Sequence, residues 1–148
     1  MNNRHILLVE DNPDDEELTL LALDQSGISY NIVVAHDGVE ALDYLFGRGR
    51  YADRDINRLP AVVLLDIKMP RIDGLEVLQR LRANDQTKLL PVVILTTSTE
   101  EQDRLNGYSF GCNSYIRKPV DYVQFMTAVK QLGVYWLLLN EDPPLLGI

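Results

Sequence analysis

The sequence predicts an α/β protein: a doubly wound, five-stranded parallel sheet with five helices. Two observations support this prediction. Short apolar runs alternate along the chain with segments of helical spacing, which is the pattern of βαβ units. Several of these runs also end in an acidic, hydroxyl or lysine residue, and right-handed crossovers would bring all the strand carboxyl ends to one edge of the sheet.

Five apolar runs are the expected strands. The run AVVLLD is the most informative, because five apolar residues lead directly into Asp66, as expected of a strand that is buried on both faces. The run HILLVE near the start of the chain is shorter and of the same kind. In chain order, the predicted strands are His5–Glu10, Asn31–Ala35, Ala61–Asp66, Pro91–Thr97 and Asn113–Lys118.

Each predicted strand is followed by a predicted helix. Pro13 suits the start of the first helix and Gly27 its end, whereas Gly133 is a weak point in the long last helix. The predicted helical segments are Asn12–Gly27, Asp37–Gly47, Gly74–Asp85, Glu100–Gly111 and Val120–Glu141. The residues expected to face the core are Leu18, Leu21 and Ala22 in the first helix, Val39, Leu42, Leu45 and Phe46 in the second, and Leu75, Leu78 and Leu81 in the third.

Length and composition limit the possible function. A chain of 148 residues favours one domain, spanning residues 1–148. The net charge of −8 argues against a nucleic-acid partner, which needs a basic face. Cys112 is the only cysteine, so no internal disulfide forms, and no apolar run is long enough for a signal peptide or a membrane span. A cytoplasmic protein with no membrane contact is expected.

Charged and hydroxyl residues follow the predicted strands. Glu10 and Asp11 follow the first, Asp66 ends the third, Thr96 ends the fourth and Lys118 ends the fifth. Three crowded carboxylates repel one another unless a cation joins them, and their oxygens suit Mg²⁺. A carboxylate beside such a metal can attack phosphorus and form an aspartyl phosphate, with the lysine and the hydroxyl neutralising phosphoryl charge.

In order and spacing, these residues resemble the receiver domains of bacterial two-component response regulators. That family has an acid pair, a phosphoacceptor aspartate followed by Met-Pro and then Gly, a Thr or Ser, and Lys-Pro. Here these are Glu10-Asp11, Asp66 with Met69-Pro70 and Gly74, Thr96, and Lys118-Pro119. The resemblance implies the flavodoxin-like strand order 2-1-3-4-5 and a signalling protein rather than an enzyme.

The resemblance also implies a role for each residue of the acidic site. Asp66 would accept the phosphoryl group from a sensor histidine kinase. Mg²⁺ or Mn²⁺ would be held by Asp11, by Asp66, by the backbone carbonyl of Lys68, and by Glu10 through water. The acids that follow, Asp14, Asp15, Glu16 and Glu17, are interpreted instead as favourable charges at a helix N-terminus.

A second group of residues is expected to read out the phosphorylation state. Thr96 would bind the phosphoryl group and Lys118 would pair with it. Tyr115 matches the aromatic side chain that moves inward with the threonine, so Thr96 and Tyr115 would form a two-state switch. The resemblance implies a cis peptide between Lys118 and Pro119. Ser98 or Thr99 is expected to cap the fourth helix.

The last part of the chain suggests self-association. After Pro119 too few residues remain for an output domain beyond the last helix, so none is expected. Residues 134–148 are interpreted as an apolar extension, because six apolar residues follow one another from Val134. A helix buries only one stripe, and exposed apolar patches usually mark protein contacts. The expected homodimer contact comprises Val134, Tyr135, Trp136, Leu138 and Leu139. The alternative is that Pro143–Leu146 fold back over these side chains.

The aromatic-leucine ending and the arginine-bearing loop over residues 47–60 resemble the small response regulators that partner cyanobacterial phytochromes. A phytochrome-type histidine kinase is therefore the expected phosphoryl donor. The loop is interpreted either as a contact for that kinase or as a solvated irregular segment.

Three other functions remain as alternatives. A degenerate receiver would act only as a binding module, but the acids, Thr96 and Lys118 are all present. An aspartate-nucleophile phosphatase needs an acid two residues after the nucleophile, and Lys68 stands there. Flavin binding on this fold needs a phosphate-cradling loop after the first strand, where this chain has EDNPDDEE.

Overall fold

A computed structural model describes residues 4–144 of the chain. Its described part forms one sheet of five parallel strands in the order β2-β1-β3-β4-β5, which confirms the predicted fold class. The strands are β1 (His5–Val9), β2 (Asn31–Ala35), β3 (Val62–Leu65), β4 (Val92–Thr96) and β5 (Ser114–Arg117). The α-helices are α1 (Pro13–Gln25), α2 (Gly38–Phe46), α3 (Gly74–Ala83), α4 (Glu101–Ser109) and α5 (Tyr122–Val134).

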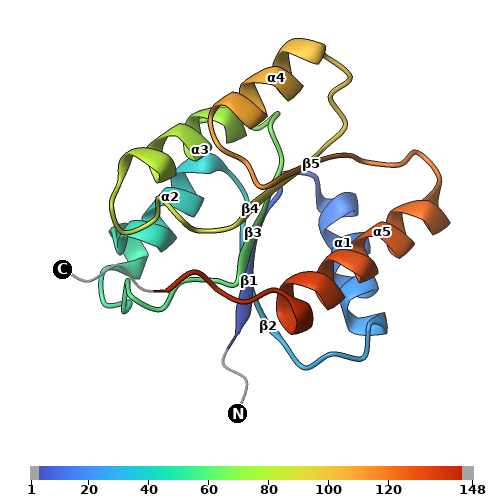
Figure 1. The fold of residues 1–148 in the computed structure, drawn as a ribbon, viewed down its shortest axis with the longest axis horizontal. Helices are drawn as coiled ribbons and strands as arrows, with labels where there is room; N and C mark the ends of the chain where they lie inside the picture. Colours follow the sequence, from blue (N-terminus) through green and yellow to red (C-terminus); the bar gives the residue numbers. More distant parts are fainter. Residues whose placement is uncertain (1–3, 145–148) are drawn as a thin grey trace.

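The helices cover both faces of the sheet. Figure 1 shows α1 and α5 on one face and α2, α3 and α4 on the other. Successive strand residues point to opposite faces, so Leu7 and Val9 belong to the core under α2 and α3, whereas Ile6 and Leu8 belong to the core under α1 and α5. The two cores account for the continuous apolar character of the central strands, because both faces of each strand are buried.

Local sequence signals define where most of the helices begin. The side chains of Asn12, Asp37, Asp73 and Asp121 accept hydrogen bonds from backbone N–H groups in the first turns of α1, α2, α3 and α5. The prediction for α4 was wrong, because its N-cap is Glu100 and this side chain makes no capping bond. Ser98 nevertheless lies beside that helix end, where its hydroxyl accepts the Glu100 N–H.

The inward face of α1 differs from the predicted one at Leu21, but Ala22 is buried and Leu18 packs against the core as predicted. Leu21 is 42 % exposed, whereas Thr19, Ala22 and Leu23 are buried. These three residues form the i, i+3, i+4 stripe that faces the core shared with α5. Gly133 of α5 permits this packing, because a Cβ atom at that position would lie 2.9 Å from Leu23 Cδ2. The glycine therefore allows two helices to approach closely.

The chain continues beyond α5 as one π-helical turn, Tyr135–Leu139. Trp136 and Leu137 are buried in the core on the α1 and α5 side, so Trp136 is not available for the dimer contact in which the sequence placed it. Val134, Tyr135, Leu138 and Leu139 are exposed.

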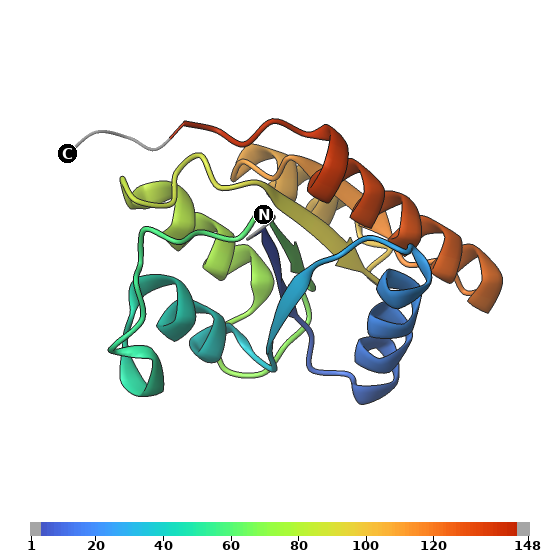
Figure 2. The ribbon, with the colours of Figure 1, turned by 90° about the horizontal axis from the view of Figure 1, so that it is seen from below.

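Arg4 holds the segment that follows the π-helical turn. Its guanidinium donates to the Trp136 carbonyl at 2.7 Å and to the Asp142 carboxylate at 2.6 Å. Figures 1 and 2 show this segment leaving α5 toward the side of α3. Pro143 and Pro144 therefore lead away from the α1 and α5 face, while Leu145 and Leu146, expected to fold back with them, lie outside the described residues.

Two arginines of the loop after α2 contact groups of the same chain. Arg50 donates to Glu40 at 3.0 Å and to the Tyr51 hydroxyl at 2.6 Å, and Arg54 stacks 3.9 Å from the centre of the Tyr44 ring. These contacts fasten the loop to α2. In the part of the chain that the structure describes, no helix combines the length and the apolar character that crossing a bilayer requires.

Candidate functional site

The carboxyl edge of the sheet gathers the residues that the sequence placed there. Three backbone hydrogen bonds continue the ladder past the strand ends: Glu10 N–H to Ala35 O at 3.0 Å, Asp66 N–H to Val9 O at 3.2 Å, and Lys118 N–H to Thr96 O at 2.7 Å. The backbone of each site residue is therefore fixed by a neighbouring strand. Because neighbouring strands are far apart in the sequence, these hydrogen bonds bring distant residues to the same edge of the sheet.

The ammonium of Lys118 is the centre of the site. It donates to Glu10 Oε1 at 2.6 Å, to Asp15 Oδ2 at 2.8 Å and to Asp66 Oδ2 at 3.3 Å. Its side chain is only 3 % exposed. Burial alone would lower the pKa of Lys118, but the hydrogen bonds to Asp15 and Glu10 and the charge of Asp66 outweigh it and raise the pKa above its ordinary value. Lys118 is therefore charged and fully engaged.

Three carboxylates form a candidate cation site beside this lysine. Glu10, Asp11 and Asp66 each offer one oxygen, and these oxygens all lie within 4.8 Å of one another. Burial raises the pKa of Glu10 to about 7, despite the opposing hydrogen bond and charge of Lys118. Two buried acids and one exposed acid with converging oxygens fit a hard divalent cation that keeps some of its water.

The Asp66 carboxylate is held in one orientation. Its Oδ1 accepts the Ile67 N–H at 2.7 Å, and its Oδ2 faces Lys118. Gly74, at the start of α3, packs against the Asp66 backbone, where an added Cβ would collide with the Asp66 carbonyl. This close approach explains why the residue that begins α3 has no side chain.

A hydrogen-bonded chain leads from the site to α4. Thr96 is fully buried, and its hydroxyl accepts the Ser98 N–H at 3.2 Å. Ser98 donates through its own hydroxyl to Asp103 Oδ2 at 2.7 Å, and Lys68 Nζ lies 3.3 Å from the same oxygen. The hydrogen bond from Ser98 and the contact with Lys68 outweigh burial and lower the pKa of Asp103. The loops after β3 and β4 are thus joined to α4.

Tyr115 lies against α4 from the neighbouring strand. Its ring packs on Gly107, where a Cβ would come within 2.9 Å of Tyr115 Cδ2. Its buried hydroxyl makes no hydrogen bond of good geometry among the described residues. Burial and the charge of Asp103 raise the pKa of the phenol, and they outweigh the nearby Ser98 hydroxyl, which lowers it. The ring is therefore packed, while its hydroxyl has the Ser98 hydroxyl nearby but no well-formed hydrogen bond within residues 4–144.

A model of the response regulator receiver domain matches residues 6–130. The chain belongs to the response regulator receiver family. This receiver is 34 % identical to the response regulator Rcp1 of Synechocystis over 132 residues, which cover 89 % of this chain and 88 % of Rcp1. The Mn²⁺-bound structure of Rcp1 matches with a TM-score of 0.88 at 33 % identity, over 95 % of this chain and 99 % of that one.

Two further solved structures resemble this receiver. One is the phosphorylated cyanobacterial phytochrome response regulator RcpA, with a TM-score of 0.88 at 36 % identity over 96 % of this chain and 99 % of that one. The other is the bacteriophytochrome response regulator AtBRR, with a TM-score of 0.74 at 52 % identity over 95 % of this chain and 100 % of that one.

Two details of the receiver site differ from the sequence-based expectation. The Lys118–Pro119 bond, expected to be cis, is trans, as are the other peptide bonds over residues 4–144; trans is the intrinsically favoured state of an X-Pro bond. Asp15, interpreted as a helix-terminal charge, contacts Lys118 directly. Its spacing of five residues from Glu10 carried no signal, because the contact depends on how α1 packs on the sheet.

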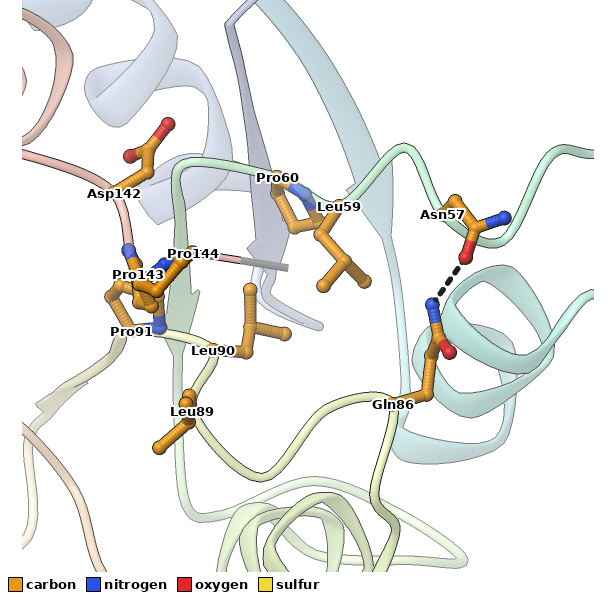
Figure 3. Close-up of a pocket in the computed structure, with 10 residues that line it drawn as sticks. All are labelled: Asn57, Leu59, Pro60, Gln86, Leu89, Leu90, Pro91, Asp142, Pro143 and Pro144. Atoms are coloured by element: carbon orange, nitrogen blue, oxygen red, sulfur yellow. Dashed lines mark hydrogen bonds between the residues drawn. The ribbon is translucent and has the colours of Figure 1, made fainter. Parts of the chain in front are cut away.

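A cavity of the receiver lies at the opposite edge of the sheet. It has a volume of about 620 Å³ and lies between the segments that enter β3 and β4 and the segment that follows the π-helical turn. Figure 3 shows Leu59, Leu89 and Leu90 among its apolar lining and Pro143 and Pro144 along one side. Since Pro60 and Pro91 precede the strands, this cavity is remote from the acidic site.

Proposed function

We propose that this receiver accepts a phosphoryl group on Asp66 and signals by a change of conformation. The observation that supports the proposal is the placement of the Asp66 carboxylate. One of its oxygens is fixed by a backbone N–H and the other faces Lys118, and the carboxylate converges with those of Glu10 and Asp11. A phosphoryl group needs this combination of a positioned nucleophile and nearby positive charge.

The proposed roles follow from the chemistry of each group. Asp11 and Asp66, with Glu10 through water and the Lys68 backbone carbonyl, would hold Mg²⁺ or Mn²⁺. When bound, the cation neutralises phosphoryl charge. The chain itself orients Asp66 through Ile67, and Lys118 supplies a buried positive charge for a phosphoryl oxygen. The Mn²⁺-bound form of Rcp1 supports the assignment of a divalent cation.

The proposed phosphoryl donor is a sensor histidine kinase of the phytochrome type. The likeness to RcpA and AtBRR, which are phytochrome response regulators, supports this choice. The phosphoryl group would move from a kinase phosphohistidine to Asp66 and later be lost to water.

The proposed readout runs through Thr96 and Tyr115. Thr96 is buried next to the site, and its hydroxyl would turn to a phosphoryl oxygen on Asp66. The buried hydroxyl of Tyr115 lacks a well-formed hydrogen bond in the described part of the chain, which is unfavourable, so a rearrangement of its surroundings would favour a new position of this side chain. Movement of the pair would alter the surface around α4.

We also propose that the receiver forms a homodimer through the exposed apolar residues around the end of α5. Val134, Tyr135, Leu138 and Leu139 are exposed, while their neighbour Trp136 is anchored in the core. Exposed apolar side chains on a firmly anchored turn favour a protein contact.

Substitution of Asp66 tests the proposed function. A small phosphodonor with Mg²⁺ is expected to label the wild-type protein, and Asp66→Asn is expected to abolish the label while leaving the thermal unfolding transition intact. Asp53→Asn, which changes an exposed aspartate remote from the site, is the matched control and should be labelled normally. An acid-labile label that persists on Asp66→Asn would refute the assignment, and an unlabelled wild type would favour a degenerate receiver.

A further inference from the structure

We infer that Asp15 is a positioning residue, which holds the Lys118 ammonium in place to meet a phosphoryl group on Asp66. The inference rests on the proposed function of Asp66 and adds a residue to that site. Asp15 stands in the first turn of α1, five residues after Glu10. The residue reaches Lys118 across 103 positions of the sequence.

Asp15 is one of three carboxylates that together fix the position of the Lys118 ammonium. A lysine ammonium has three N–H donors, and here Glu10, Asp15 and Asp66 accept from it at 2.6, 2.8 and 3.3 Å. The Lys118 side chain is almost fully buried, so these three carboxylates, rather than water, define where its charge lies.

Asp15 differs from the other two acceptors in what else it does. Glu10 and Asp66 belong to the carboxylate cluster that would hold a cation, and Asp15 does not. Asp66 would in addition change chemically when it accepts a phosphoryl group. Asp15 is thus the one carboxylate partner of Lys118 whose position need not change during the proposed reaction.

The backbone of Asp15 is fixed independently of the site. Its N–H donates to Asn12 Oδ1 at 3.1 Å, and its carbonyl accepts from the buried Thr19 hydroxyl at 2.7 Å. This rigid first turn of α1 provides the anchor that a positioning residue requires.

Positioning and simple charge predict opposite results. If Asp15 acted only as a negative charge near the site, its removal would strengthen the binding of any anion at Asp66. If Asp15 positions Lys118, its removal weakens the binding of a phosphoryl group, because the ammonium is drawn toward Glu10 or becomes mobile. The sign of the change separates the two roles.

The experiment measures the beryllofluoride concentration, at fixed Mg²⁺, that gives half the maximal shift of the Thr96 and Tyr115 amide resonances. Beryllofluoride imitates a phosphoryl group on a carboxylate. Asp15→Ala is expected to raise this concentration about tenfold, the effect of losing an orienting charge-assisted hydrogen bond. Asp15→Asn should retain most of the affinity, because an amide oxygen still accepts from the ammonium.

Asp14→Ala is the matched control. Asp14 is an exposed aspartate in the same turn and does not contact Lys118. Its substitution removes the same charge, so the affinity for beryllofluoride should stay equal or rise slightly. In a Lys118→Ala background, Asp15→Ala should have no further effect, since Asp15 acts through the lysine. The inference would be overturned if Asp15→Ala bound beryllofluoride as tightly as wild type or more tightly. It would also be overturned if Asp15→Ala lowered the affinity by the same factor in the Lys118→Ala background.

A second readout does not depend on the phosphoryl group. A rigid, buried ammonium gives a slowly exchanging ¹⁵Nζ signal in the NMR spectrum. The chain has four lysines, and the signal that disappears in Lys118→Ala is the signal of Lys118. Asp15→Ala should broaden or remove that signal, and Asp14→Ala should leave it. If wild type failed to bind beryllofluoride, the proposed function of Asp66 would fail, while this signal would still decide whether Asp15 positions Lys118.

Discussion

At the scale of single residues, the site depends on one lysine shared among several acids. Buried carboxylates are costly unless they are paired, and Lys118 supplies the partner for both Glu10 and Asp66. The raised pKa of Glu10 shows that this pairing compensates only part of the burial cost. The same lysine is therefore both a structural counter-charge and the proposed sensor of phosphate.

Lys118→Ala is expected to weaken phosphate-dependent switching more than phosphorylation itself. The nucleophile Asp66 and its hydrogen bond to Ile67 remain, so labelling by a small phosphodonor should persist, whereas the phosphoryl group loses its buried cation. The comparison is between the amount of label and the phosphate-dependent shift of the Tyr115 amide resonance. Equal loss of both would argue against a sensing role. Lys88→Ala, at an exposed lysine, is the control.

At the scale of elements, α4 and β5 meet at Tyr115, whose ring is closely packed but whose hydroxyl lacks a well-formed hydrogen bond within residues 4–144. Gly107 admits the Tyr115 ring, while the Tyr115 hydroxyl lacks a hydrogen bond among the described residues. The contrast with Tyr44 is direct, because the Tyr44 hydroxyl bonds to the buried His5 ring at 2.8 Å. The Tyr44 hydroxyl is therefore held by a short hydrogen bond, and the Tyr115 hydroxyl is not held by one of good geometry in this part of the chain.

Two Tyr→Phe substitutions test this contrast. Tyr115→Phe should leave the free energy of unfolding unchanged or raise it slightly, because an unpaired buried hydroxyl is removed. Tyr44→Phe should lower it by about 1–3 kcal/mol, because His5 loses its partner. Urea unfolding of the unphosphorylated protein measures both. A large loss of stability in Tyr115→Phe would show that its hydroxyl is hydrogen-bonded in solution.

At the scale of the whole molecule, stability should fall in mild acid because of His5. Burial, with the charges of Arg54 and Arg58, lowers the pKa of His5 from 6.5 to about 4. Between these two values the unfolded chain binds a proton that the folded chain does not, so the free energy of unfolding decreases as the pH falls.

The His5 effect should amount to about 2 kcal/mol between pH 7.5 and pH 5. His5→Gln should remove this part of the pH dependence. His36→Gln, at an exposed histidine beside Glu16, should keep it. Urea unfolding of the three proteins at both pH values provides the measurement, and an equal pH dependence in wild type and His5→Gln would contradict the assignment.

The second prediction for the whole molecule concerns self-association. Leu139→Glu places a charge among the exposed apolar residues that follow α5 and is expected to convert a dimer into a monomer, as measured by light scattering. Leu105→Glu changes an equally exposed leucine on α4 and should leave the dimer intact. A wild-type protein that is monomeric in dilute solution would count against the proposed interface.

Much of this architecture could be inferred before any coordinates. The alternation of apolar runs and amphipathic segments predicted five parallel strands and five helices, and the residues after the strands predicted the cluster of Glu10, Asp66 and Lys118. Both inferences succeed for the same reason: in a parallel sheet, side-chain periodicity and strand direction are local properties that place the residue following each strand at one known edge.

Other features could not be inferred, because they depend on the relative placement of distant elements. The contact between Asp15 and Lys118 requires a particular packing of α1 against the sheet. The burial of Trp136 beside the exposed Leu138 and Leu139 depends on where the π-helical turn meets the core. In each case a run of similar residues, four acids or six apolar side chains, carries no local signal of which member faces inward, and only the three-dimensional packing of the chain distinguishes them.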